Sequence, residues 1–234
     1  MSPSTPNSEL TSEAKRALLA QLLQQKQCQT EAAFPLSANQ QALWFLYKLA
    51  PESWAYNVLF SACIRSEVDG DALERSFQDL VDRHPSLRTT YTAIEGSPVQ
   101  QIQPSARVHF IRVDAADLDD EQLHDRLTSE GQRPFDLERG SVFRVHLFSR
   151  SAADHVLLLA VHHVAVDLWS LTVLLDELRV AYAARVAKQT PSLPPLAAQY
   201  SDFVRKQAHW LDGEDGDRLL SYWKQQLEGE LPLL

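Results

Sequence analysis

A run of apolar residues that is followed by two adjacent histidines limits what this chain can fold into. Residues 156–178 read VLLLAVHHVAVDLWSLTVLLDEL, in which a β-strand pattern gives way to His162 and His163, then to Asp167, then to a helical pattern. Successive side chains of a strand point to opposite faces of a sheet. The two histidines therefore cannot easily share one metal ion or one substrate atom. We expect one of them to hold the backbone and the other to face a cavity.

The carboxylate of Asp167 suits the point where the strand ends and the helix begins. It can cap the helix at its positive end, or it can pair with an arginine and so hold the loop. Either role fixes the position of His163 without making Asp167 an acid or a base. A metal site conflicts with the opposed directions of the histidines, and the sequence has no G-x-S-x-G elbow for a serine-based triad. A pair of satisfied core histidines is the plainest alternative.

The rest of the chain alternates between strand and helix patterns, which predicts a mixed α/β fold with helices over a largely mixed sheet. Ser37 is a good N-cap for a helix with Leu43, Leu46 and Leu49 at helical spacing. A turn is expected at residues 96–98. The strand patterns are YNVLFSACIR, LRTTYTAI, VQQIQP, VHFIRVDA and SVFRVHLFSR, the last of which is expected to pair with the strand that ends at the histidines.

Charge and cysteine content exclude several classes of partner. The formal net charge of −9 argues against a nucleic-acid partner, because phosphate binding needs a basic face. Cys28 and Cys63 have neither disulfide nor metal-ligand spacing and are expected to be unpaired thiols, buried or half-buried. The polar N-terminus lacks a signal-peptide core, and the longest apolar run, residues 156–161, is too short to cross a bilayer. We therefore expect no membrane partner and a cytoplasmic location.

An amphipathic helix is expected ahead of the main body of the chain, at residues 10–27. It either lies on its own domain or docks on another protein. Its narrow apolar stripe, which would make the docking contact, consists of Leu18, Leu19, Leu22 and Leu23.

Five segments, taken in order, resemble the condensation domains of nonribosomal peptide synthetases. The segment HHVAVDLWS, residues 162–170, is similar to the HHxxxDG motif of that family. The resemblance covers about residue 34 to the C-terminus, and five segments in register make it specific. The other four segments are LSANQQALWFL (36–46), YNV (56–58), DRHPSLRTTY (82–91) and RPFDLERGSVFRVHLF (133–148).

The resemblance implies a fold of two lobes, each of the chloramphenicol-acetyltransferase type, with a tunnel between them. The histidine motif would lie on the N-terminal lobe at the middle of the tunnel. We therefore expect an α/β (α+β) sandwich, the N-terminal lobe of a condensation domain preceded by a short helix. The expected divisions are a tail and docking or linker helix (1–33), the lobe (34–190), and a proline-containing linker with helices that lead to a missing second lobe (191–234).

The resemblance also implies acyltransferase chemistry, namely amide formation between a carrier-bound acyl or peptidyl thioester and a carrier-bound aminoacyl amine. By its place in the motif, His163 is the catalytic imidazole, which takes a proton, orients the amine or steadies developing charge. No permanently bound cofactor is implied, because the substrates travel on phosphopantetheine arms. The partners would be an upstream donor carrier protein, recognised in trans through the N-terminal helix, a downstream acceptor carrier protein, and the second lobe.

Three alternatives to this function remain open. A related domain could epimerise its substrate, or form an ester instead of an amide. A non-catalytic carrier-docking module would bind without reaction. The 234-residue chain by itself is expected to be an incomplete enzyme that binds without turnover.

His162 and Asp167 carry over from the family as structural members of the motif. The resemblance implies an arginine of DRHPSLR as the ion partner of Asp167, with Arg83 as the first choice and Arg88 as the second. Losing one partner of a buried ion pair costs about 3–5 kcal/mol. Asp167→Ala is therefore expected to lose activity mainly by damaging the fold.

Leu168 stands where the family usually has glycine, and Trp169 and Ser170 follow it. Because leucine does not favour a positive φ, a wider turn is expected, with Leu168 or Trp169 narrowing the tunnel near His163. The alternative is that both side chains pack beneath the new helix. Bulky residues at this place resemble those of hybrid polyketide–peptide assembly lines, which indicates a polyketide acyl donor.

Overall fold

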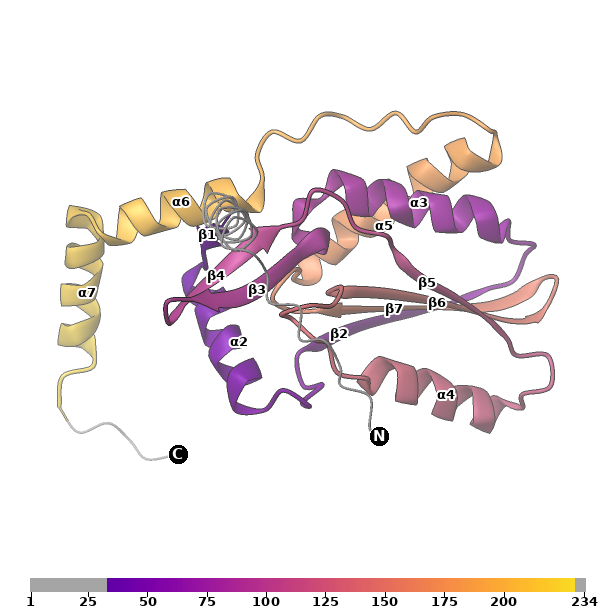
Figure 1. Cartoon of the computed structure of the whole chain (residues 1–234), viewed down its shortest axis with the longest axis horizontal. Helices are drawn as coiled ribbons and strands as arrows, with labels where there is room; N and C mark the ends of the chain where they lie inside the picture. Colours follow the sequence, from indigo (N-terminus) through magenta and orange to yellow (C-terminus); the bar gives the residue numbers. More distant parts are fainter. Residues whose placement is uncertain (1–32, 230–234) are drawn as a thin grey trace, which may run out of the picture. The chain divides into compact units, whose positions relative to one another are not determined.

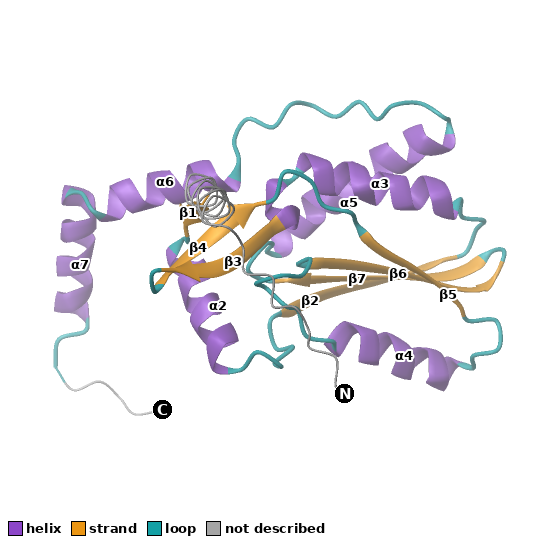
Figure 2. Ribbon diagram, in the orientation of Figure 1, coloured by secondary structure: helices purple, strands orange, loops and turns teal. Residues whose placement is uncertain are grey.

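Strands and helices alternate through residues 33–229, the part of the chain that the computed structural model describes (Figures 1 and 2). Apart from Ala33, these residues belong to one unit, Phe34–Leu234. The elements in chain order are β1 (Ala33–Pro35), α2 (Ala38–Leu49), β2 (Asn57–Ile64), α3 (Gly70–Arg83), the 3₁₀ helix η1 (Pro85–Arg88), β3 (Thr89–Ile94), β4 (Ser97–Ile102), β5 (His109–Asp114), α4 (Asp120–Gln132), β6 (Phe143–Ser151), β7 (Asp154–His162), α5 (Leu168–Val186), α6 (Tyr200–Leu211) and α7 (Glu214–Gln226).

The larger sheet has four strands in the order β2-β7-β6-β5. β7 is antiparallel to both of its neighbours, β2 and β6, whereas β5 runs parallel to β6. The predicted mixed sheet is therefore confirmed, and so is the expected pairing of SVFRVHLFSR with the strand that ends at the histidines. β7 ends at His162, so His163 is the first residue beyond the strand.

Helices cover both faces of this sheet, with α3 and α5 along one face and α4 along the other (Figure 1). Side chains of β6 alternate between the two layers, since Val145 and Leu147 join the core with α3 and α5, and Phe148 joins the core with α4. β7 lies in the middle and is buried on both faces, which explains its almost continuous run of apolar residues.

The smaller sheet has the strand order β1-β4-β3. β3 and β4 form a hairpin whose two-residue loop is Glu95 and Gly96, with φ of 53° and 84°. Two left-handed residues are typical of the type I′ turn, which matches the twist of the flanking strands. The turn thus comes one residue earlier than the predicted residues 96–98, and Pro98 lies within β4.

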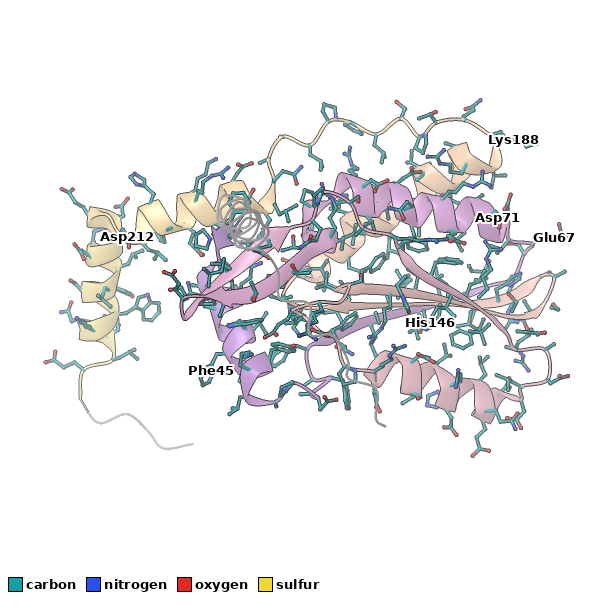
Figure 3. All side chains as sticks on the ribbon, viewed as in Figure 1. Phe45, Glu67, Asp71, His146, Lys188 and Asp212 are labelled. Atoms are coloured by element: carbon teal, nitrogen blue, oxygen red, sulfur yellow. The ribbon has the colours of Figure 1, made fainter. Side chains whose placement is uncertain are left out.

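The start of α2 follows the sequence pattern, whereas its buried face departs from it. Ser37 caps α2 as predicted, and in a capping box its side chain and that of Gln40 each accept from the other residue's backbone N–H. The leucines at helical spacing do not all lie on the buried face, because Leu49 is 71% exposed, whereas Trp44 and Gln40 are buried. Phe45 is exposed as well (Figure 3). Leucine spacing alone did not reveal that the buried face of α2 contains a polar side chain.

Several sequence-based expectations are corrected or fall outside the described residues. Cys63 is an exposed thiol on β2, not a buried or half-buried one, because β2 is an edge strand. Within residues 33–229, no helix combines the length and the apolar character that crossing a membrane requires. Cys28 and the predicted docking stripe lie outside the described residues. The stripe consists of Leu18, Leu19, Leu22 and Leu23.

Candidate active site

The two adjacent histidines lie in opposite environments at the end of β7. His162 is buried, with 4% of its surface exposed, whereas His163 is exposed. His162 completes the row of alternating β7 side chains and His163 begins the loop to α5. The structure thus places one imidazole inside the protein and the other accessible, as expected. His163 is exposed because it lies beyond the end of β7, whose two faces are both buried, and not because of strand alternation.

The buried ring of His162 holds the start of the loop. Its Nδ1 accepts a hydrogen bond from the backbone N–H of Val164 at 3.1 Å. The ring also meets Phe135 edge-on, with 6.2 Å between the ring centroids. Burial, together with the neighbouring His163, lowers the pKa of His162 from its ordinary value of 6.5 to about 4. His162 is therefore a neutral, structural side chain at neutral pH.

This pKa makes the stability of the protein depend on pH. His162 takes up a proton near pH 6.5 in the unfolded chain, but only near pH 4 in the folded chain. The stability that is present above pH 6.5 is therefore lost as the pH falls from 6.5 towards 4. Between pH 7 and pH 5 the lost free energy of unfolding is about 2 kcal/mol. His162→Asn keeps an acceptor for Val164 but does not titrate. Urea unfolding at several pH values should give a shallower pH dependence for this variant, and equal slopes would contradict the assignment.

The exposed ring of His163 is fixed through one of its two nitrogens. Its Nδ1 lies 2.7 Å from the carbonyl oxygen of Val166, and its backbone N–H donates to the carbonyl of Tyr56 at 2.8 Å. A carbonyl oxygen only accepts, so Nδ1 carries the hydrogen, and in the neutral ring Nε2 is then the unprotonated nitrogen. His163 is therefore an exposed imidazole, held in one tautomer, whose unprotonated nitrogen makes no hydrogen bond within the described part of the chain.

A buried polar cluster holds the loop that carries His163. The carbonyl of Val164 accepts from Nε2 of Gln40 at 3.2 Å and from the hydroxyl of Tyr91 at 3.3 Å. Both side chains are buried, and Oε1 of Gln40 accepts in turn from Gln100 at 3.3 Å. Neither Gln40 nor Tyr91 was predicted as a site residue. The signal available in the sequence was a glutamine on the inner side of an amphipathic helix. A buried polar group needs a hydrogen-bond partner, so such a glutamine is expected to bind another part of the fold.

Asp167 is the N-cap of α5, one of its two predicted roles, and the predicted ion pair with an arginine is wrong. Its carboxylate accepts from the backbone N–H of Ser170 at 2.7 Å and from the Ser170 hydroxyl at 2.6 Å. These hydrogen bonds hold the pKa of Asp167 below its ordinary value, and the bond from the Ser170 hydroxyl has the larger effect. Arg83 instead pairs with Glu177, and Arg88 donates to the carbonyl of Gln103. Within residues 33–229, Asp167 forms no ion pair or hydrogen bond with an arginine.

Distance along α5 explains why Arg83 does not reach Asp167. Glu177 lies ten residues beyond Asp167 on the same helix, which at 1.5 Å per residue is about 15 Å away. Nε of Arg83 lies 3.1 Å from both carboxylate oxygens of Glu177, and Nε2 of His84 lies 2.6 Å from one of them. The DRHPSLR segment therefore binds the middle of α5 and not its beginning. Glu177 is a charged partner that the sequence pattern did not reveal.

Leu168 and Trp169 project outward at the start of α5. Each side chain is 78% exposed, so the alternative that they pack beneath the helix is wrong. Leu168 does not need the freedom of glycine, because the described residues with positive φ other than glycine are Glu95 and Lys188. Trp169 and Ser170 line a pocket of about 250 Å³. His163 is not among the lining residues, although Val166, its hydrogen-bond acceptor, is.

Comparison with known proteins assigns a family to this arrangement. The condensation-domain family matches residues 30–234. One of the linear gramicidin synthase proteins of Brevibacillus parabrevis is 41% identical over 204 residues, which are 86% of this chain and 3% of that protein. The dimodular nonribosomal peptide synthase of Bacillus subtilis (strain 168) is 37% identical over 199 residues, which are 83% of this chain and 8% of that protein.

Solved structures agree with this assignment. The X-domain from teicoplanin biosynthesis, in its complex with OxyB, superimposes with a TM-score of 0.77 at 33% identity, over 85% of this chain and 45% of that chain. The starter condensation domain of the rhizomide synthetase RzmA has the same fold, with a TM-score of 0.76 at 19% identity, over 86% of this chain and 49% of that one. The chain thus spans a small part of the curated relatives and somewhat less than half of these solved chains. By motif, fold and sequence, this chain belongs to the condensation-domain family of nonribosomal peptide synthetases.

Proposed function

We propose that this chain supplies the N-terminal half of a site that joins a carrier-bound acyl thioester to a carrier-bound amine, with His163 as the proton acceptor. The observation that carries the proposal is the hydrogen bond from Nδ1 of His163 to the carbonyl of Val166. It keeps an exposed imidazole in the tautomer whose Nε2 can accept a proton. Membership of the condensation-domain family supports the same chemistry.

The reaction is an acyl transfer in which one bond forms and one breaks. The amine nitrogen attacks the thioester carbonyl carbon, and a carbon–nitrogen bond forms. Nε2 of His163 takes the proton that this nitrogen must lose. The carbon–sulfur bond then breaks, and the proton passes from the imidazole to the leaving sulfur. The products are an amide and a free phosphopantetheine thiol, with no oxidant, metal or nucleotide consumed.

Proximity and proton transfer together account for the rate of this reaction. An α-amino group has a pKa of about 8, so part of it is already a nucleophile at neutral pH. Holding two tethered reactants in contact supplies up to about 7–11 kcal/mol of the barrier reduction. A placed general base adds about 10²–10⁴-fold. Replacement of His163 should therefore slow the reaction without abolishing carrier binding, which separates its role from that of the carrier contacts.

We further propose the domain divisions that the resemblance implies, with a lobe at residues 34–190 and a connection to a second lobe at residues 191–234. The exposed apolar side chains of α6 and α7 support this division. They need a cover, and a second lobe would provide it. The most exposed of these side chains are Phe203, Trp210, Leu220, Tyr222 and Trp223.

The proposal can be tested with the full polypeptide that carries this chain, one acyl-loaded donor carrier protein and an acceptor carrier protein. Mass spectrometry of the acceptor carrier should show one new amide with an amine acceptor and no ester with the matched hydroxy acid. Ester formation alone would contradict the proposal and favour an ester-forming relative. Inversion of the donor stereocentre without transfer would favour an epimerising one.

A binding module is the second candidate. The observation that favours it is the 33% identity to the X-domain, whose solved structure is a complex with the protein OxyB. In that case, no transfer should occur with any donor. Affinity for a partner protein would remain, and replacement of His163 would leave that affinity unchanged.

A further inference from the structure

A small pocket of about 190 Å³ lies between the beginning of β3, residues 103–107 after β4, and residues 139–141 before β6. Its lining includes three arginines, Arg88, Arg107 and Arg139, and contains no aspartate, glutamate or histidine. An arginine guanidinium stays protonated throughout the physiological pH range. The chain as a whole carries a formal net charge of −9, so this local excess of positive charge runs against the composition of the protein.

Within residues 33–229, none of these arginines has a close carboxylate partner. The guanidinium of Arg88 donates to the carbonyl oxygen of Gln103 and forms no ion pair. That of Arg139 forms no ion pair either. Arg107 approaches Glu74 only to 3.9 Å, and 89% of the Arg107 side chain is exposed. Three like charges that lack close carboxylates repel one another, and an anion in the pocket would remove that repulsion.

The uncharged side chains of the lining also favour a ligand that accepts hydrogen bonds. Oγ1 of Thr90 accepts from Nε2 of Gln103 at 2.9 Å, and the hydroxyl hydrogen of Thr90 has no acceptor within the described residues. Thr90 can therefore donate to a ligand oxygen. The hydroxyl of Ser141 already donates to the carbonyl of Phe143 at 2.8 Å. The pocket thus offers charged and neutral donors together, which suits an oxyanion.

The number of donors favours a phosphate dianion over a carboxylate. A carboxylate has one charge and two oxygens, whereas a phosphate monoester has a charge of about −1.5 to −2 at pH 7 and three terminal oxygens. Guanidinium groups bind phosphate through two parallel N–H···O hydrogen bonds. A water molecule takes about 30 Å³ in the liquid, so the pocket has room for about six waters, or for one phosphate group with part of its hydration shell.

We propose that this pocket binds the dianionic phosphate group of a small free molecule, either inorganic phosphate or a phosphate monoester, between Arg88, Arg107 and Arg139. The phosphate that joins a phosphopantetheine arm to its carrier protein is a diester with one negative charge and two free oxygens, so it fits this site less well. The site is therefore separate from the proposed amide formation, and the failure of either assignment leaves the other standing.

Isothermal titration calorimetry of the 234-residue chain tests the assignment, with inorganic phosphate, glycerol 3-phosphate, dimethyl phosphate and acetate as ligands. One or both of the first two should bind at least about ten-fold more tightly than the diester and the carboxylate, and their ratio distinguishes a free phosphate ion from a monoester. The affinity for glycerol 3-phosphate should rise up to about ten-fold between pH 5 and pH 7, because its second pKa is about 6. No side chain of the lining titrates in that range.

Arg139→Gln removes one guanidinium at an exposed position and should weaken phosphate binding about ten-fold or more. Arg179→Gln is the matched control and should leave the affinity unchanged. Arg179 is also exposed and without an ion pair among the described residues, and it lies on α5 outside the lining. Both variants should keep the Tm of the unaltered chain, because substitutions at exposed positions have small effects on stability.

Three results would overturn the assignment. Equal affinity for the monoester and the diester would contradict the choice of a dianion. Equal losses of affinity in Arg139→Gln and Arg179→Gln would show a general attraction to positive charge on the surface and no defined site. The absence of binding by both inorganic phosphate and glycerol 3-phosphate would show that the arginines are merely solvated.

Discussion

Replacing His163 by asparagine should lower kcat for amide formation by about 10²–10⁴-fold, the range for loss of a positioned general base. The amide nitrogen of asparagine can take the place of Nδ1 and still donate to the carbonyl of Val166. The variant therefore keeps the loop contact and loses only the basic Nε2. Because His163 is exposed, the free energy of unfolding should change by less than about 1 kcal/mol. Single-turnover transfer from a loaded donor carrier measures the chemical step.

The control for this experiment is His124→Asn, the same substitution at an exposed histidine on α4. It should leave both kcat and stability unchanged. If His163→Asn retained kcat within about three-fold of the unaltered enzyme, an imidazole base at this position would contribute less than about 1 kcal/mol. Proton transfer would then have to occur through solvent or through another group.

Glu177→Ala should be strongly destabilising, by about 3–5 kcal/mol. Its carboxylate binds Arg83 and His84, and the side chains of Glu177 and Arg83 are only 12% and 18% exposed. Without Glu177, the guanidinium of Arg83 stays between α3 and α5 with the carbonyl of Pro194 as its remaining partner. At about 2–4 °C per kcal/mol, Tm should fall by about 6–20 °C. Urea unfolding and a thermal scan measure both quantities.

Two further variants set the scale for the loss at Glu177. Asp167→Ala removes only a helix cap and should cost about 1 kcal/mol. Asp176→Ala, an exposed neighbour of Glu177, should change stability by less than about 0.5 kcal/mol. A larger loss for Asp167→Ala than for Glu177→Ala would restore the ion-pair role that the sequence predicts for Asp167. The contacts of the two carboxylates predict the opposite order.

Local periodicity predicted the parts of this fold that depend on neighbours in the sequence. The strand of apolar residues up to His162 and the N-cap at Ser37 both follow from patterns within about ten residues. The opposite burial of His162 and His163 was also expected, although its cause is the end of the strand at His162 and not the two-residue period. These features are confirmed because nothing distant in the chain has to be known for them.

Partners across the fold could not be predicted in the same way. Glu177 meets Arg83 because α3 and α5 lie side by side, and the register of two helices is set by their packing and not by either sequence alone. Gln40 reaches Val164 across more than a hundred residues of chain for the same reason. The resemblance placed the correct segments together, but it assigned the arginine to the wrong carboxylate.

The exposure of Leu168 and Trp169 lies between these two cases. The sequence marked Leu168 as a departure from the family motif, and it left open whether Leu168 and Trp169 pack beneath the helix. Which side of α5 faces water depends on how the helix packs through Leu171, Leu174 and Leu178, and the residues around Leu168 do not reveal that packing.

The tautomer of His163, on which its role as a base depends, can be observed by nitrogen-15 NMR of the uniformly labelled protein under conditions in which the ring is neutral. The hydrogen bond to Val166 predicts a protonated Nδ1 and an unprotonated Nε2, with the chemical shifts of those two nitrogen types. The opposite tautomer, with the hydrogen on Nε2, would leave no base facing the substrates and would contradict the role given to His163.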